Sequence, residues 1–484
     1  MDFFINQAMG MGNSGIEHSE FYRAKRFEEA KLPYRFVFLA KVPELHKAMA
    51  KWRLKEQNVI NMWEYFVLGD DYLKDGLTET FPEKKARTLS DNTNTMRLNE
   101  LYTDSGMHIV HHFVKQQNKQ EPDSKILLVR TYQTQIFNTK TGELKVSYET
   151  VDNAHEENRM QNFHLYSQNG EHLFFANVVR LYHYFFSELD RFFGGKSNFY
   201  IDRGDWADEA LMNEPIPDAK LIYLIHADHL ADRKDPDKPF WNNYYEYLLD
   251  HLNKVDQVVV STEQQRQDLL IDFPQEAQKI SAIPVGGISD RPKDIKDRDR
   301  KGLKLITASR LAKEKHVDIA VKAVAELHDE GENISFDIYG AGEEKQHLED
   351  LVKEKHAEKY IHVRGLSQHL ELVYPRHDAF ISTSFSEGFG LTYIEALNAA
   401  LPVVTFNARF GATQLIRDGE NGFVQELKRD DDDFNVAQIK EGITRLLKAD
   451  YVKLRRNTQV GIDKYRNSAI AKQWKELVDG LRTN

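Results

Sequence analysis

Two carboxylates, Glu387 and Glu395, bracket a glycine-rich turn in the stretch Glu-Gly-Phe-Gly-Leu-Thr-Tyr-Ile-Glu. The turn opens a predicted helix, and the free N–H groups at a helix start suit an anionic ligand. A carboxylate at a helix start is favourable on electrostatic grounds alone, but that does not explain Gly388 and Gly390. Glycine lets a ligand approach the backbone closely. A carboxylate one to two turns into the helix suits the hydroxyls of a sugar or ribose.

A cationic pair, Arg310 and Lys315, lies upstream of these carboxylates, directly after a predicted strand. A run such as Lys313-Glu314-Lys315 is usually a solvated surface, but ligands bind at the carboxyl ends of strands in open α/β sheets. A bidentate guanidinium and an ammonium can share two phosphates and stabilise a UDP leaving group. Together with the carboxylates, the pair predicts a nucleotide-sugar site and therefore a glycosyltransferase.

Other predicted strands end in residues that suit the same ligand. Gly340 follows the strand Ser335–Tyr339, and Gly365 follows Ile361–Arg364. Each glycine alone is typical of an ordinary strand-to-helix turn. Both nevertheless fall on the strand edge that carries Arg310, where a base and a ribose would lie.

The sequence His226-Ala227-Asp228-His229 ends another predicted strand. Two histidines and one aspartate could bind a metal, but no further set of ligands is evident nearby. A contact to a sugar hydroxyl or a phosphate is the favoured interpretation, with His226 first. We expect no metal.

The glycines of Gly10-x-Gly12-x-x-Gly15 follow the predicted strand Phe3–Gln7, as in the dinucleotide fingerprint. The fingerprint also requires an acidic residue after the second strand, and here that strand ends at Lys41. NAD and FAD are therefore disfavoured. A turn that admits a diphosphate or an acceptor is favoured, and a plain tight turn stays open. Ser14 and Glu17 predict a capping box for the following helix.

The alternation of strands and helices predicts an α/β protein with two doubly wound, Rossmann-like domains. The expected parts are an acceptor-side domain (1–42 and 195–285), an inserted region (43–194), a nucleotide-sugar domain (286–467) and a helix that crosses back (468–484). The insert is expected to begin with a charged helical segment and to continue as an antiparallel β-meander. Its hairpin signals are Thr141-Gly142 and Asn169-Gly170, and a helix over 177–193 ends it.

Five strands are expected in each Rossmann-like domain. In the first they are Phe3–Gln7, Tyr34–Ala40, Asn198–Asp202, Leu221–His226 and Val255–Ser261. In the second they are Leu303–Ser309, Ser335–Tyr339, Ile361–Arg364, Ala379–Thr383 and Pro402–Phe406.

Composition narrows the functional classes. The 484 residues carry a net charge of −11, which argues against nucleic acid as a partner. Cysteine is absent, which excludes disulfides and cysteine nucleophiles and fits a cytoplasmic protein. The N-terminus lacks the basic region of a signal peptide, and no apolar run reaches the length of a membrane span. Peripheral contact with the inner face of the cell membrane stays open.

These motifs resemble those of family-four retaining glycosyltransferases with the GT-B fold, over about 285–484. Longer stretches resemble, over most of the chain, the family of catalytic A subunits of the accessory Sec-system O-glycosyltransferases of Gram-positive bacteria. The stretches that carry this second resemblance are Ser14–Glu17, His226–His229, Trp241–Tyr245, Ile283–Gly286 and Leu305–His316.

The resemblance implies two such domains facing a cleft, and transfer of N-acetylglucosamine from UDP-GlcNAc to serine or threonine of a serine-rich repeat adhesin before export. It implies a non-catalytic B subunit, bound partly through the meander, in an assembly of two A and two B chains. It also implies retention by front-face displacement, with UDP-GlcNAc as donor and no cofactor or metal.

The resemblance also assigns roles to matched positions. Catalysis would fall to Arg310, Lys315, Glu387 and His226. The sugar would contact His226, Glu387, Gly388, Phe389 and Gly390. UDP would contact Gly15, Ile16, Glu17, His18, Arg310, Lys315, Gly340, Gly365, Leu366, Ser367, Leu391, Thr392 and Glu395. The sequence departs from the family at Asp228, where relatives carry Glu, and in a loop after Gly365 that is one residue longer.

Three alternatives remain open at this stage. A related transferase that adds GlcNAc or glucose to wall teichoic acid would have the same site. A catalytically silent nucleotide-sugar-binding subunit is disfavoured by the intact set of charged residues. An NAD-dependent oxidoreductase is disfavoured by the missing ribose carboxylate. The sequence does not distinguish UDP-GlcNAc from UDP-glucose as donor.

Overall fold

The computed structural model describes residues 1–12, 15–82, 86–90, 96–118, 121, 124–153, 156–166, 170–232, 238–291 and 302–483. It divides into two compact units. The first comprises Met1–Phe21, Leu32–Leu224 and Asn243–Gln257, and the second comprises Tyr22–Lys31, Ile225–Asn242 and Val258–Asn484. Among the described residues, no helix has both the length and the apolar character needed to cross a membrane.

A seven-stranded sheet begins at the N-terminus, with the strand order β16-β15-β12-β11-β1-β2-β3. Its pairings within β3-β2-β1-β11-β12 and between β15 and β16 are parallel. The strands are β1 (Asp2–Asn6), β2 (Tyr34–Phe38), β3 (Val59–Asn61), β11 (Asn198–Ile201), β12 (Lys220–Ile225), β15 (Gln257–Val260) and β16 (Ile280–Ala282). Every residue of β1 is buried, as expected for a strand covered on both faces.

The structure differs from the sequence prediction at β3. The charged segment after residue 43 was expected to be helical, but Val59–Asn61 pairs with β2 and extends the Rossmann-like sheet. A three-residue strand carries no periodic signal, and only its partner identifies it. The helices of the first unit are α2 (Leu45–Trp52), α3 (Met62–Leu68), α4 (Asp70–Asp75), α5 (Val178–Phe192), α6 (Trp206–Asn213) and α7 (Glu246–Asp250), with part of α1 (Gly15–Glu29). Ser14 of the predicted capping box lies outside the described residues.

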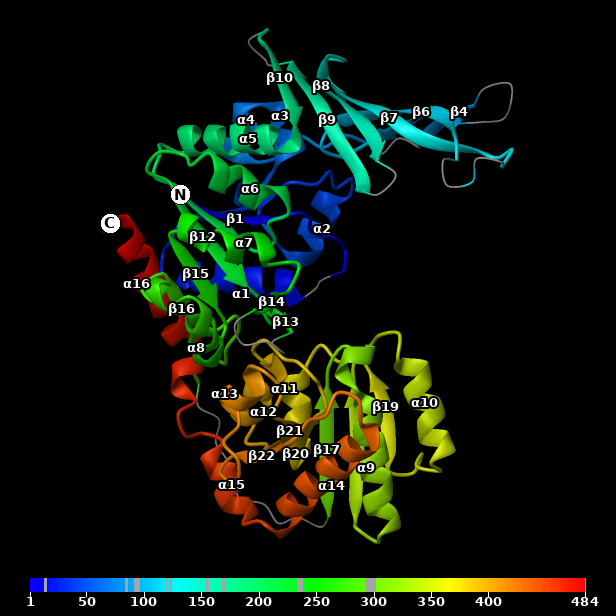
Figure 1. Cartoon of the computed structure of the whole chain (residues 1–484), viewed down its shortest axis with the longest axis vertical. Coiled ribbons are helices and arrows are strands. Elements are labelled where there is room, and N and C mark those ends of the chain that lie inside the picture. The colour runs from blue at the N-terminus through cyan, green and yellow to red at the C-terminus, as the bar shows by residue number, and fades with distance from the viewer. Residues whose placement is uncertain are drawn as a thin grey trace. The chain divides into compact units, whose positions relative to one another are not determined.

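The inserted meander is a second seven-stranded sheet, in which each strand pairs antiparallel with the next (Figure 1). Its strands are β4 (Arg87–Ser90), β5 (Met96–Tyr102), β6 (Met107–Gln117), β7 (Leu127–Asn138), β8 (Leu144–Asn153), β9 (Glu156–Tyr166) and β10 (His172–Asn177). The predicted hairpin at Thr141-Gly142 joins β7 to β8, whereas Asn169 lies outside the described residues. The predicted helix follows β10 as α5, capped by the Asn177 side chain.

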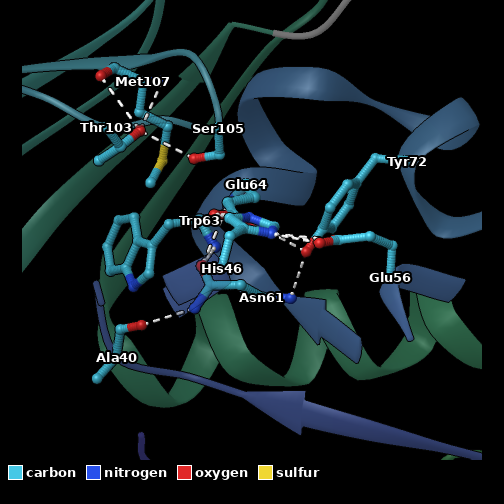
Figure 2. Close-up of polar contacts among 10 residues, drawn as sticks. All are labelled: Ala40, His46, Glu56, Asn61, Trp63, Glu64, Tyr72, Thr103, Ser105 and Met107. Carbon is cyan, nitrogen blue, oxygen red and sulfur yellow. Dashed lines mark hydrogen bonds and ion pairs between the residues drawn. The ribbon is translucent and has the colours of Figure 1, made fainter. Parts of the chain in front are cut away.

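A buried ionic network ties α2, α3 and α4 of the first unit together (Figure 2). The His46 ring lies between two carboxylates, with Nδ1 3.0 Å from Glu56 and Nε2 3.0 Å from Glu64. The Tyr72 hydroxyl donates to Glu64 at 2.7 Å and accepts from the Asn61 amide. Burial lowers the pKa of His46, but the hydrogen bonds to Glu56 and Glu64 outweigh it and raise the pKa to about 10.

The second unit contains a six-stranded parallel sheet with the order β19-β18-β17-β20-β21-β22. The strands are β17 (Leu303–Ala308), β18 (Ile334–Tyr339), β19 (Ile361–Gly365), β20 (Ala379–Ser382), β21 (Val403–Phe406) and β22 (Gly422–Gln425). The first five match the predicted strands, and β22 was not predicted. The predicted helix after β17 is α9 (Val317–Asp329), which buries Val317, Ala320, Val321 and Val324.

The remaining helices of the second unit complete its layers. They are α8 (Glu263–Asp272), α10 (Lys345–Glu354), α11 (Leu370–Val373), α12 (Leu391–Asn398), α13 (Gly411–Leu415), α14 (Asp432–Lys448), α15 (Tyr451–Asn457) and α16 (Asn467–Thr483). The last helix packs on α1, where the ring of Trp474 lies 5.7 Å from that of Phe27. The Tyr22 hydroxyl donates to Asn467 at 2.8 Å. The C-terminal helix therefore contacts a helix from the first thirty residues.

Candidate active site

The turn after β17 presents the predicted cationic pair. Leu311 donates its N–H to Ala341 at 2.9 Å, so the turns after β17 and β18 lie against each other. A Cβ at Gly340 would lie 1.9 Å from the Ser309 carbonyl oxygen, and its φ of +149° also disfavours other residues. Gly340 therefore allows the close approach of two strand ends at this edge of the sheet.

Lys315 and Glu387 form an ion pair across two strand ends of the second unit. Nζ of Lys315 lies 2.6 Å from Oε1 of Glu387, and the side chains are only 17% and 20% exposed. The Thr383 hydroxyl donates to the Lys315 carbonyl at 3.1 Å, and the Ser384 hydroxyl donates to Glu387 at 3.3 Å. The sequence separation between the two charges is large, so their contact is a product of the fold.

Arg310 is far more exposed than Lys315, its predicted partner in phosphate binding. Its side chain is 70% exposed and pairs with Glu314, four residues further along the chain, at 2.5 Å. A surface pair of this kind contributes little to stability, so the guanidinium can exchange Glu314 for another anion at low cost. The fold thus brings Lys315 and Glu387 together and leaves the Arg310 side chain exposed on the surface beside them.

The loop that carries Glu387 lies against the segment that carries His226. A Cβ at Gly388 would lie 2.6 Å from the His226 carbonyl oxygen, so only glycine permits this backbone contact. The predicted helix begins one residue after Gly390, as α12. Phe389 is buried against Tyr465, which leaves its backbone as the part that can face a ligand. Both predicted sugar-binding segments thus meet within the second unit.

Glu395 lies one turn into α12, where its position is set by a residue that the sequence did not single out. The Tyr374 hydroxyl donates to Oε2 of Glu395 at 3.1 Å. Burial and then the Glu395 carboxylate raise the pKa of Tyr374 well above its usual range, so the phenol stays a donor. Tyr374 lies in a short 3₁₀ helix (Tyr374–Arg376), which carries no sequence signal for a site.

Removing this hydroxyl should weaken donor binding. We expect Tyr374→Phe to raise KM for the nucleotide sugar about three- to tenfold with kcat almost unchanged, because a misoriented Glu395 would lose about 1 kcal/mol of hydrogen bonding. Steady-state kinetics at varied donor concentration measures this. Tyr451→Phe, which removes a buried hydroxyl that donates to Asp378, is the matched control. An unchanged KM in Tyr374→Phe would contradict the assignment.

The segment proposed for the base follows β19. Gly365 ends the strand and accepts from the Gly340 amide at 2.9 Å, the Leu366 side chain is 74% exposed, and the Ser367 hydroxyl accepts from the His369 amide. Leu391 is partly exposed and Thr392 is half-buried at the start of α12. These positions share the carboxyl edge of the second sheet, as expected.

The first unit holds the predicted Gly15–His18 segment at the start of α1. Burial lowers the pKa of His18, against the opposing effect of Glu17. The turn before the helix packs on α2 through a hydrogen bond from the Trp52 indole to the Gly10 carbonyl at 3.0 Å. At the end of β2, where a dinucleotide fold needs a carboxylate, Lys41 donates to the Tyr148 hydroxyl. The position where the dinucleotide fold needs a ribose-binding carboxylate therefore carries a lysine that is bonded to the meander.

No group of three or more His, Cys, Asp or Glu side chains within the described residues is placed to hold a metal ion. In the His226–His229 segment, His229 is fully buried and its Nε2 lies 3.3 Å from Asp268. Asp228 accepts from the Leu230 amide at 3.0 Å. These side chains are therefore engaged with the surrounding structure.

A family model described as "Glycosyl transferases group 1" matches residues 290–460. With two Rossmann-like sheets and charged residues at the strand ends, the chain is a UDP-sugar glycosyltransferase with the GT-B fold. One relative is the GtfA subunit of the UDP-N-acetylglucosamine–peptide N-acetylglucosaminyltransferase of Streptococcus pneumoniae serotype 4. It is 30% identical over 464 residues, which cover 87% of this chain and 87% of the relative. The chain belongs to this family of GtfA subunits.

Two further matches extend over the whole chain. The GtfA subunit of Streptococcus parasanguinis is 28% identical and covers 99% of this chain and 98% of its own. A solved structure described as the crystal structure of a GtfA/B complex has a TM-score of 0.75 at 23% identity and covers 100% of both chains. The fold of this structure, the meander included, therefore recurs along the full length.

Proposed function

We propose that this protein transfers N-acetylglucosamine from UDP-GlcNAc to serine or threonine hydroxyls of a serine-rich repeat adhesin, in the cytoplasm and before export. The observation that carries the proposal is the Lys315–Glu387 pair, set against the His226 backbone at the carboxyl edge of the second sheet. A cation next to a carboxylate in a partly buried site suits a sugar diphosphate, with the ammonium on phosphate and the carboxylate on sugar hydroxyls. Membership of the GtfA family supports the choice of sugar and of a peptide acceptor.

The proposed reaction is a front-face displacement with retention. The acceptor oxygen forms a bond to the anomeric carbon on the side from which UDP leaves, while the bond between that carbon and the diphosphate oxygen breaks. A donor phosphate oxygen takes the acceptor proton. Arg310 and Lys315 stabilise the charge of the departing UDP, and His226 and Glu387 orient the sugar. In this proposal the two cations supply the charge stabilisation, and no metal is required.

The remaining assigned positions complete the proposed donor site. Glu395, with Leu391 and Thr392, is assigned to the ribose end of UDP, and Gly365–Ser367 to the base. Gly15–His18 of the first unit are assigned to UDP as part of the same proposal.

The meander is the proposed docking surface for a non-catalytic B subunit, in an assembly of two A and two B chains. Large apolar side chains are exposed on the strands of the meander and at Ile126, directly before β7. Exposed apolar side chains that gather on one element are typical of a protein-binding surface. The exposed side chains here are Leu89, Val114, Ile126, Leu127, Val129, Tyr132 and Phe174. The description of the related solved structure as a GtfA/B complex supports a partner of this kind.

The test is an acceptor assay with defined donors. The purified protein, with and without a candidate B subunit, is incubated with UDP-GlcNAc or UDP-glucose and a serine-rich peptide, and the peptide is weighed by mass spectrometry. We expect a mass gain of one N-acetylhexosamine per modified residue, and equal activity in EDTA. UDP release without peptide modification would redirect the proposal to wall teichoic acid as acceptor. The absence of UDP release in every arm would favour a catalytically silent subunit.

A further inference from the structure

Arg409 connects the two segments that carry Glu387 and His226. Its backbone carbonyl accepts from the Glu387 amide at 2.8 Å, and the Phe410 amide returns a bond to the Glu387 carbonyl at 2.6 Å. These bonds form an isolated parallel bridge between Glu387 and Phe410. The main chain around Arg409 therefore fixes the orientation of the Glu387 loop.

The side chain of Arg409 reaches the second segment. Its Nη2 forms an ion pair with Asp268 of α8, and its Nε lies 3.6 Å from Oδ2 of Asp228. The guanidinium carbon also lies 4.5 Å from the centre of its neighbouring Phe410 ring. A planar guanidinium presents its N–H donors in a rigid fork, so it can hold two carboxylates in one fixed geometry, whereas an ammonium is a single point charge with rotatable donors. Arg409 thus bridges the residue two positions after His226 to α8.

The surroundings hold this bridge in one arrangement. The buried His229 ring stacks on Phe410 with centres 5.8 Å apart, and its Nε2 lies 3.3 Å from Asp268. On the other side of the segment, the Ala227 carbonyl accepts from the Gln265 amide at 2.7 Å. These contacts hold the residues on either side of Asp228, and the Arg409 guanidinium adds the link from the Asp228 carboxylate to Asp268 and to the Glu387 loop.

We propose that Arg409 is a positioning residue for the transfer reaction, which sets the His226 segment against the Glu387 loop through Asp228 and Asp268. The inference rests on the proposed roles of His226 and Glu387 and goes beyond them, because it assigns Arg409 a role that acts through these residues. The contact at Gly388 leaves 2.6 Å between a hypothetical Cβ and the His226 carbonyl, so a small shift changes how the two segments meet. A displacement of about 1 Å in a reacting group can cost about 100-fold in rate.

The test compares Arg409→Met with a matched arginine. Arg445 also pairs with an aspartate, Asp418, at 2.7 Å and also lies over a phenylalanine ring, that of Phe423, at 4.6 Å. We expect Arg409→Met to lower kcat by about 10- to 100-fold, measured as UDP release in the presence of the acceptor peptide. The affinity of the protein for UDP should not change. Arg445→Met should remain within about twofold of the wild type, since exposed ion pairs contribute little.

A double-variant cycle separates positioning from a general structural role. If Arg409 acts through His226, His226→Ala combined with Arg409→Met should be no slower than His226→Ala alone. Arg409→Lys, which keeps the charge but loses the rigid fork of donors, should lower kcat about tenfold and replaces Arg409→Met if that variant does not fold. The inference would be overturned if the kcat of the double variant fell by the product of the two single losses. It would also be overturned if Arg409→Met were as active as Arg445→Met. Wild-type turnover in both Lys315→Ala and His226→Ala would instead remove the proposed site, and this inference with it.

Discussion

Replacing Lys315 by alanine should lower kcat by about 100- to 1,000-fold while the fold stays intact. The ammonium is the least exposed cation of the candidate site, and it lies 2.6 Å from Glu387. It would stabilise the charge of the departing UDP and keep Glu387 in place. Its removal would therefore affect the leaving group and the sugar contact together. Steady-state UDP release with a serine-rich peptide measures the loss, and circular dichroism checks the fold.

A matched lysine provides the control for this prediction. Lys322 pairs with Asp318 at 2.8 Å within the neighbouring helix α9 and is not assigned to the candidate site. Lys322→Ala should retain turnover within about twofold, as expected for a surface pair. Arg310→Ala should also lower turnover strongly, although its guanidinium pairs with Glu314 in this structure. Near-normal turnover of Lys315→Ala would remove the diphosphate assignment from this turn.

Replacing His46 by alanine should destabilise the first unit by about 3–5 kcal/mol. Glu64 is 1% exposed, and without the imidazolium its buried charge would keep the hydrogen bond from the Tyr72 hydroxyl but lose its cationic partner. Hydrogen exchange of peptides covering α3 and α4 reports this local free energy of opening. The control is His251→Ala. Within the described residues, the His251 ring hydrogen-bonds to the Tyr247 carbonyl and stacks on the Tyr247 ring. Unchanged exchange in His46→Ala would show that the network contributes no stability.

The His46 network should also give stability a defined pH dependence. The folded-state pKa of His46 is about 10, above its ordinary value of 6.5, because Glu56 and Glu64 favour the charged ring. The stabilisation is therefore complete below about pH 6.5 and is lost as the pH rises through about 10. The difference in opening free energy between wild type and His46→Ala should shrink over that range. A difference that stays constant from pH 6 to pH 10 would contradict the raised pKa.

Much of the fold was predictable because its signals are local. The buried parallel strands of the second unit are short segments rich in apolar residues, and glycine or charged turns follow them. The family motif is equally local, since the residues after β17 and before α12 occur within single short stretches. In the meander, the turn residues Thr141-Gly142 gave a similar local signal, because they form the hairpin between β7 and β8.

Strands too short for a pattern were missed. The three-residue β3 and the four-residue β22 are defined by their pairing with β2 and β21, not by their own composition. The first was therefore assigned to a helical segment, and the second was not assigned. β4 and β5 also escaped prediction at the start of the meander, because their polar sequences show little hydrophobic alternation.

The sequence by itself determined the class of protein, because the types and local spacing of the residues around Arg310 and Glu387 are sufficient to predict a sugar-diphosphate site. Only the tertiary structure decided how these residues are arranged. It joined Lys315 to Glu387, packed Gly388 against the His226 carbonyl, bonded Tyr374 to Glu395, and paired Arg409 with Asp228 and Asp268. These contacts connect residues far apart in the chain, and no sequence pattern records them because each depends on how strand ends and loops meet in three dimensions.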